Sequence, residues 1–143
     1  MSDANITKIG AGVMIFKSGK ILLGHRKSKY GDGEYAFPGG RLEYAESFEE
    51  CARREIAEES GIEIENIRFQ FLANIKKYAP EHHYIYVGLI ADWKHGEPQS
   101  LEPDKNIEWK WYDLKELPKP LFITSQLAVK SHSNGTNYYD SEE

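Results

Sequence analysis

The chain has 143 residues, of which 40% are hydrophobic and 29% charged, values typical of a single soluble globular domain. Its formal net charge of −5 argues against a protein that coats nucleic acid polymers, and its longest uncharged apolar stretch, residues 11–16, is far shorter than the roughly 20 residues of a membrane span. Since the first residues carry no secretory signal pattern and the single cysteine, Cys51, cannot form an internal disulfide, we expect a cytoplasmic protein.

Most of the predicted elements are strands. They comprise residues 6–16, 21–25, 35–37, 67–78, 83–93 and 108–112. A hairpin turn at residues 17–20 joins the first two, and helices are predicted over residues 48–60 and, roughly, 122–131. This order fits a mixed sheet flanked by helices, within a single domain over residues 1–131. Residues 132–143 are polar and rich in Gly and Asn, so we expect a poorly ordered tail there.

The helix over residues 48–60 has clear predicted ends. Ser47 and Glu50, three residues apart, have the pattern of a capping box at its start, and Gly61 is well placed to end it. At 100° per residue, one side of this helix collects the apolar residues Phe48, Cys51, Ala52 and Ile56. We expect this apolar stripe to face the core.

Three glutamates of the same helix are placed against its local preferences. Glu55 and Glu59 lie in the middle of the apolar stripe, and Glu58 lies about one sixth of a turn away. The first two are like charges at i, i+4, which costs roughly 0.2–0.5 kcal/mol, and the helix dipole disfavours negative charge near its C-terminus. Pairing with Arg54 explains Glu58 but not the two inward glutamates. A hard divalent cation such as Mg²⁺ or Mn²⁺ explains all three, because it neutralises carboxylates that would otherwise repel each other.

Residues 40–62 match the pattern GX5EX7REUXEEXGU, in which U is apolar, at every defined position. By this motif the chain resembles the Nudix hydrolase family, and over most of its length it is similar to the MutT-type nucleoside triphosphate pyrophosphatases. The resemblance implies an α/β/α sandwich with a mixed sheet, in which the motif forms a loop-helix-loop. It also implies Mg²⁺-dependent hydrolysis of a nucleotide phosphoanhydride, with Mn²⁺ as a substitute ion, in a homodimeric protein.

The resemblance also assigns roles to residues of the motif. The implied metal ligands are Glu55, Glu58 and Glu59. Glu46 and Arg54 would hold the loop and the helix together beside them. Gly39 and Gly40 would let the backbone approach the metal and the phosphates closely, since glycine has no Cβ.

The general base is left open among three acids. Glu58 belongs to the motif, whereas Glu102 and Asp104 lie in the loop before the last predicted strand. A positioned carboxylate that removes a proton from water contributes about 10²–10⁴-fold to the rate. The predicted catalytic residues are therefore Glu55, Glu58, Arg54 and Glu102.

Three residues outside the motif are candidates for substrate binding. Arg26, at the end of the second predicted strand, is a candidate phosphate contact. Phe122 and Ile123 open the C-terminal helix and align roughly with residues that line the base pocket in MutT-type relatives. Two of the three have a plain structural alternative, a solvated charge for Arg26 and a core position for Phe122.

The leading functional hypothesis is hydrolysis of a nucleoside triphosphate to a nucleoside monophosphate and pyrophosphate. The enzymatic alternative is hydrolysis of a dinucleoside polyphosphate, ADP-ribose or a nucleotide sugar. Lys77 occupies the position at which ADP-ribose members tend to carry a proline, while Tyr78 falls where dinucleoside polyphosphate hydrolases often place a tyrosine. A non-catalytic nucleotide sensor is a third alternative, which the retained motif glutamates disfavour.

Overall fold

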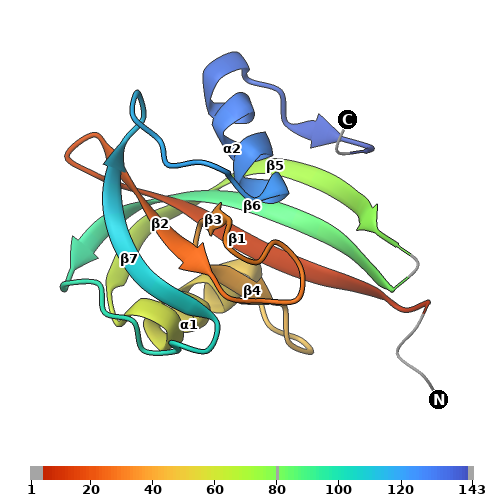
Figure 1. The fold of residues 1–143 in the computed structure, drawn as a ribbon, viewed down its shortest axis with the longest axis horizontal. Helices are drawn as coiled ribbons and strands as arrows, with labels where there is room; N and C mark the ends of the chain where they lie inside the picture. The colour runs from red at the N-terminus through yellow and green to blue at the C-terminus, as the bar shows by residue number, and fades with distance from the viewer. Residues whose placement is uncertain (1–4, 80, 142–143) are drawn as a thin grey trace.

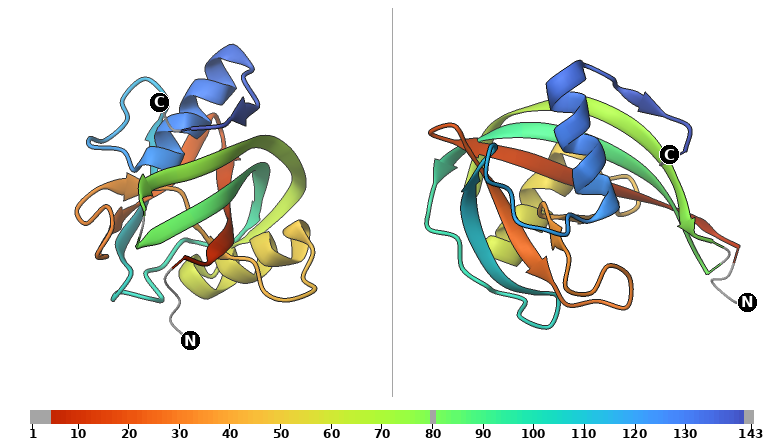
Figure 2. Two further views of the ribbon diagram at one scale, coloured as in Figure 1. Left: turned by 90° about the vertical axis from the view of Figure 1, so that its right-hand side faces the viewer. Right: turned by 45° about the horizontal axis from the view of Figure 1, so that its top comes forward.

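The structure is a computed structural model, and it describes residues 5–79 and 81–141. In this part of the chain a mixed eight-stranded sheet lies between helix α1 (Phe48–Ser60) and helix α2 (Ile123–Asn134), which cover opposite faces (Figures 1 and 2). The predicted sheet flanked by helices is confirmed. Neither helix in the described residues is long and apolar enough to cross a membrane.

The sheet is built around a parallel pair at its centre. The strands are β1 (Thr7–Lys17), β2 (Lys20–Arg26), β3 (Tyr35–Ala36), β4 (Gly39–Arg41), β5 (Glu63–Tyr78), β6 (His82–His95), β7 (Asn106–Asp113) and β8 (Tyr138–Tyr139). Their order is β3-β2-β1-β6-β5-β8, with β4 paired to β1 and β7 paired to β2. Parallel pairing joins β1 to β6 and β5 to β8, and every other strand pair is antiparallel.

All six predicted strands are present, with ends shifted by a few residues, but β4 and β8 were not predicted. Strand β4 contains Gly39 and Gly40, which the sequence indicated as the end of a strand. They pair with Ala11 and Gly12 of β1, and a Cβ on Gly39 would lie 2.3 Å from the Ala11 carbonyl oxygen. Glycine is needed here for close backbone approach, so its low strand propensity is overridden by the packing.

Helix α1 begins and ends where the sequence predicted. The Ser47 side chain accepts a hydrogen bond from the Glu50 backbone N–H, and the Glu50 side chain accepts one from the Ser47 backbone, so the capping box is confirmed. Gly61 follows in the left-handed conformation, with φ of 76°, and its N–H bonds the Ala57 carbonyl. These local signals fix the register of the helix, and with it the direction of each glutamate.

Two separate clusters of apolar side chains fill the two faces of the sheet, one under each helix. Strand β1 supplies both, because successive residues point to opposite faces: Val13 and Ile15 pack on the α1 side, and Met14 packs on the α2 side. Trp109 and Trp111, two residues apart on β7, both pack on the α1 side. Residues two apart on a strand share one face, as these two rings do.

The C-terminal segment differs from the poorly ordered tail predicted from residue 132. Helix α2 runs on to Asn134, and Gly135 ends it in the left-handed conformation. Tyr138 and Tyr139 then form β8 beside β5, where the Tyr139 ring meets Phe71 edge-on at 5.8 Å. The Gly/Asn composition reflects a helix C-cap and a turn into a short strand. Residues 142–143 lie outside the described residues.

Candidate active site

The glutamates of α1 differ in exposure in the order that the helical geometry predicted. Glu59 is 5% exposed, and the side chain of Glu55 is 14% exposed, whereas the side chain of Glu58 is 49% exposed. The first two therefore turn toward the sheet, and Glu58 stands at the rim. Two carboxylates on the inner face of one helix form the acidic part of the site.

Glu59 is held by groups from two other strands. Its Oε1 accepts a hydrogen bond from the Gly39 N–H at 2.8 Å, and its Oε2 accepts one from Asn106 Nδ2 at 3.1 Å. The Trp109 indole N–H donates to the backbone carbonyl of Glu59 at 3.2 Å. The pKa of the Glu59 carboxyl is raised to about 8, chiefly by burial and in part by the charges of Glu55 and Glu102, while the Gly39 hydrogen bond opposes the shift.

Glu55 lies against the glycines of β4. A Cβ on Gly40 would come within 2.3 Å of the Glu55 carboxylate, so no residue other than glycine fits without moving this side chain. Arg54 Nη1 donates to Glu55 Oε1 at 2.6 Å, yet burial still raises the pKa of the Glu55 carboxyl. The two glycines thus bring the backbone of β4 against both inward carboxylates.

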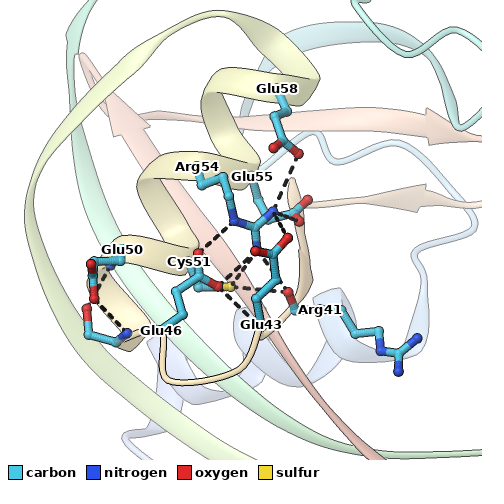
Figure 3. Close-up of polar contacts among 9 residues, drawn as sticks. Arg41, Glu43, Glu46, Glu50, Cys51, Arg54, Glu55 and Glu58 are labelled. Carbon is cyan, nitrogen blue, oxygen red and sulfur yellow. Dashed lines mark hydrogen bonds and ion pairs between the residues drawn. The ribbon is translucent and has the colours of Figure 1, made fainter.

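Arg54 joins the motif loop to α1 (Figure 3). Its guanidinium binds Glu46 with two hydrogen bonds, of 2.6 and 3.0 Å, and donates to the Arg41 carbonyl at 3.0 Å. Glu58 Oε2 lies 3.5 Å from Arg54 Nη1. Hydrogen bonds from Arg54 lower the pKa of the Glu46 carboxyl to about 2. This geometry matches the loop-holding role that the family resemblance implied for Glu46 and Arg54.

The loop before β7 brings one further acid to the site. Oε1 of Glu102 is buried without a hydrogen-bond partner among the described residues, and the charge of Glu102 acts on Glu59. Asp104 is exposed in the same loop. The sequence proposed both acids and did not separate them. Asn106, which bonds Glu59, was missed, because a buried asparagine at a strand start has no distinguishing pattern in the sequence.

A pocket opens beside Gly39 and Gly40 and extends away from α1. It is lined mainly by glycines, aromatic rings and two arginines: Gly10, Ala11, Gly12, Arg26, Tyr30, Ala36, Phe37, Gly39, Gly40, Arg41, Ile75, Tyr78, His82, Tyr84, Tyr86, Phe122 and Thr124. No acidic or amide side chain is among these described lining residues. The site therefore has an acidic half, on α1, and a cationic and aromatic half, in the pocket.

Arg26 and Phe122, both predicted as substrate contacts, lie against each other in this pocket. The Arg26 guanidinium carbon is 4.0 Å from the centre of the Phe122 ring, and its Nε and Nη2 both donate to the Tyr30 carbonyl. Burial lowers the pKa of the guanidinium, and the nearby Tyr78 and Glu59 oppose that effect. Ile123 is buried in the α2-side cluster and is not among the lining residues.

The loop of Lys29 and Tyr30 contacts the start of β6 beside the pocket, where Tyr30 and His82 are both lining residues. The Tyr30 ring stacks on His82 at 4.5 Å, and the Tyr30 hydroxyl donates to Glu81 Oε2 at 3.0 Å. Lys29 Nζ bonds the same Glu81 oxygen at 3.1 Å. We refer to Lys29, Tyr30, Glu81 and His82 as the clasp. Both side chains of the Lys29–Glu81 ion pair are largely exposed, so water and dissolved ions screen their attraction.

The residues present suit a divalent cation, although the described part of the chain contains no group of three His, Cys, Asp or Glu side chains already arranged as a metal site. The inward carboxylates of Glu55 and Glu59 are hard oxygen donors, and their burial as like charges disfavours ionisation without a counter-charge. The unpartnered Oε1 of Glu102 adds a third oxygen donor nearby.

The relationship of this chain to known proteins follows from a family profile and from a solved structure. The family profile described as NUDIX domain matches residues 7–130. The chain belongs to the Nudix hydrolase family. The crystal structure of a MutT NUDIX hydrolase from Burkholderia pseudomallei superposes with a TM-score of 0.83 and 31% sequence identity, over 88% of this chain and 98% of that one. The expected Nudix α/β fold is thereby confirmed.

Curated relatives include proteins with different named substrates. A Danio rerio protein named oxidized purine nucleoside triphosphate hydrolase is 32% identical over 74% of this chain and 66% of its own length. A Vibrio parahaemolyticus protein named NAD-capped RNA hydrolase NudC is 31% identical over 81% of this chain and 42% of its own length. The chain thus spans about two thirds or less of the length of these relatives.

Proposed function

We propose that the protein is a Mg²⁺-dependent Nudix pyrophosphohydrolase that converts a nucleoside triphosphate to a nucleoside monophosphate and pyrophosphate. One observation carries the proposal. The inward carboxylates of Glu55 and Glu59 meet an arginine- and aromatic-lined pocket at Gly39 and Gly40. The phosphates of a nucleotide need positive charge and close approach of the backbone, whereas its nucleobase needs flat apolar surfaces. This site provides these two environments on different sides.

Glu55, Glu58 and Glu59 are the proposed ligands of the cation, which when bound supplies charge neutralisation of the phosphates and acidifies water. Each side chain has a separate part in this arrangement. Glu59 presents a carboxylate fixed by two N–H donors, and Glu55 presents one whose partner is Arg54. Arg54 keeps the motif loop seated on α1 through Glu46.

Two carboxylates are candidates for the general base. Glu102 has a buried oxygen without a hydrogen-bond partner among the described residues, which leaves it able to accept a proton from water. Glu58 stands exposed at the rim, and its Oε2 lies 3.5 Å from Arg54 Nη1. The unpartnered Oε1 supports Glu102 as the base, although its Oε2 lies 3.7 Å from Lys105 Nζ, and Glu58 is then proposed as a ligand.

The pocket supplies the remaining contacts to the substrate. Arg26, charged and half-buried, is the proposed phosphate contact, and the Phe122 ring beside it is a proposed stacking surface for the nucleobase. Ile123 supports this wall from the core and is proposed to act through packing. Tyr30 and His82 of the clasp also line the pocket.

A second candidate, hydrolysis of a dinucleoside polyphosphate, ADP-ribose or a nucleotide sugar, is supported by Tyr78. Its ring lines the pocket and lies nearly parallel to that of Phe122, with an interplanar angle of 10°. A second base or a sugar could use this surface if the clasp opened. The relatives named for NAD-capped RNA also act, by their name, on a dinucleotide end.

The two candidates are distinguished by products. The full chain is incubated with Mg²⁺ and a panel of nucleoside triphosphates, dinucleoside polyphosphates, ADP-ribose and nucleotide sugars, and products are identified by chromatography. Pyrophosphate from triphosphates supports the proposal, whereas turnover confined to the other classes overturns it. Glu59→Gln is the inactive control, and Glu49→Gln, on the exposed side of α1, is the matched active control. A homodimer is also proposed, and light scattering after size exclusion tests it.

A further inference from the structure

Asn106 lies where three parts of the site meet. It is the first residue of β7, is 8% exposed, and stands opposite Arg26 in the register of β2 and β7. Its backbone N–H donates to the Glu102 carbonyl at 3.0 Å, and its own carbonyl accepts from the Ser100 hydroxyl at 2.7 Å. Its side chain donates to Glu59. One buried residue thus connects the acidic helix, the Glu102 loop and the strand of Arg26.

The Asn106 amide and the Gly39 N–H hold the Glu59 carboxylate from two strands. Gly39 bonds Oε1 and Asn106 bonds Oε2, so rotation of the carboxylate about its last bond would break both hydrogen bonds. Each oxygen has two acceptor positions, and one hydrogen bond leaves the other position available. A fixed plane with one unused lone pair on each oxygen is the form in which a carboxylate binds a cation without further ordering.

The residue type is specific to this task. An ionised carboxylate only accepts hydrogen bonds, so the group facing it must be a donor, and the amide nitrogen supplies one without adding charge. A lysine or arginine in the same place would neutralise Glu59 and compete with a metal ion. An apolar residue of the same size would leave Oε2 without its donor and the carboxylate free to turn.

We infer that Asn106 is a positioning residue, which holds the Glu59 carboxylate in the orientation that binds the divalent cation and fixes the Glu102 loop relative to it. The inference rests on the proposed function. Because Asn106 acts on the orientation of the Glu59 carboxylate, its replacement is expected to weaken metal binding and turnover while leaving nucleotide affinity unchanged. A purely structural residue would instead lower stability without selecting metal binding.

The test compares Asn106→Leu with Gln70→Leu. Gln70 is also a buried amide, but it donates to the Ala128 carbonyl on the α2 side, away from Glu59. Mn²⁺ binding without nucleotide is measured by electron paramagnetic resonance, thermal unfolding is followed in EDTA, and kcat and KM are measured with Mg²⁺. Asn106→Leu is expected to weaken Mn²⁺ binding about 10-fold or more and to lower kcat with KM unchanged, while Gln70→Leu lowers only the melting temperature.

The outcomes separate the inference from the function it rests on. Wild-type protein that binds Mn²⁺, together with Asn106→Leu that binds it within twofold of wild type, overturns the inference alone. Wild-type protein that binds no Mn²⁺ overturns both. If Asn106→Leu does not fold, the smaller Asn106→Ala variant gives the same measurement. Equal loss of Mn²⁺ affinity in Gln70→Leu also overturns the inference, because the effect would then follow from stability.

Discussion

The acidic half of the site and its aromatic half are built in different ways. Glu59 and Arg54 each make several hydrogen bonds, and a Cβ on Gly39 or Gly40 of β4 would lie too close to its neighbours. Around the clasp the contacts are ring stacking and one exposed ion pair. The half proposed to carry the reaction tolerates little change, whereas the half proposed to select the substrate can be altered with modest effect. The following predictions test this contrast.

The largest effect is expected for Glu59→Gln. The substitution removes a negative charge from the proposed metal site and presents an amide N–H₂ group to at least one of two N–H donors, Gly39 or Asn106. We expect kcat to fall by about 10³-fold. Because the charged form of a buried carboxyl is costly, the variant should be at least as stable as wild type in EDTA. Steady-state kinetics measure the change in kcat, and thermal unfolding measures the change in stability. Turnover at the wild-type rate would show that Glu59 takes no part in the reaction.

Gly40→Ala probes the same half through geometry alone. The added methyl group would meet the Glu55 carboxylate at 2.3 Å, and that side chain must turn away. A displacement of about 1 Å at a reacting centre costs about 10²-fold in rate, so we expect a loss of that size in kcat. Turnover within a fewfold of wild type, in a variant with an unchanged circular dichroism spectrum, would contradict the tight packing of this half.

In the aromatic half, Phe122→Ala is expected to act on binding. The change removes the surface under Arg26 and one ring of the near-parallel pair with Tyr78. We expect KM for the triphosphate to rise about 10-fold, with kcat within about twofold of wild type. Initial rates over a range of substrate concentrations separate the two constants. A fall in kcat without a rise in KM would show that the two halves are not independent.

Glu46→Gln tests whether the Arg54 network contributes to stability through charge. A carboxyl whose pKa is lowered by folding, from 4.5 to about 2 for Glu46, stabilises the fold above pH 4.5, and this contribution is lost as the pH falls from 4.5 toward 2. The variant should therefore unfold at lower urea concentration than wild type at pH 7, and the difference should shrink over that window. Parallel pH profiles would exclude Glu46 as the source.

The smallest effect is expected at the clasp. Glu81→Gln weakens an ion pair with Lys29 whose side chains are both more than half exposed. Exposed pairs are strongly screened, so we expect KM to change by less than about twofold at low salt and by nothing measurable at high salt. Kinetics at two ionic strengths check this. A large change in kcat would mean that opening of the clasp limits turnover.

The sequence predicted the parts of the site that depend on local pattern. Ser47, Glu50 and Gly61 define α1 by contacts within a few residues, and the helical period then directs Glu55 and Glu59 inward. Asn106 could not be found in this way, because its partner is 47 positions away and only the fold brings them together. The clasp was missed for the same reason, since Tyr30 and Glu81 are 51 residues apart.

The tail after α2 was predicted from composition, which does not reveal long-range pairing. Tyr138 and Tyr139 have strand-forming side chains, but two residues are too few to stand out beside Gly135 and the polar residues around them. Their partners, Leu72 and Ala73, lie near the middle of β5. Local rules therefore predicted the ends of α1 and the direction of its glutamates, and predicted much less wherever the structure depends on contacts between distant segments.

Strand β8 has a further consequence, for how the molecule behaves at high concentration. Strand β5 has 16 residues and would form the outer edge of the sheet, with exposed Phe69 near its middle. A long apolar edge is a template on which other chains add strands and aggregate. The two residues of β8 occupy this edge at Leu72 and Ala73. By pairing with the middle of β5, this short segment occupies part of an edge on which another chain could add a strand.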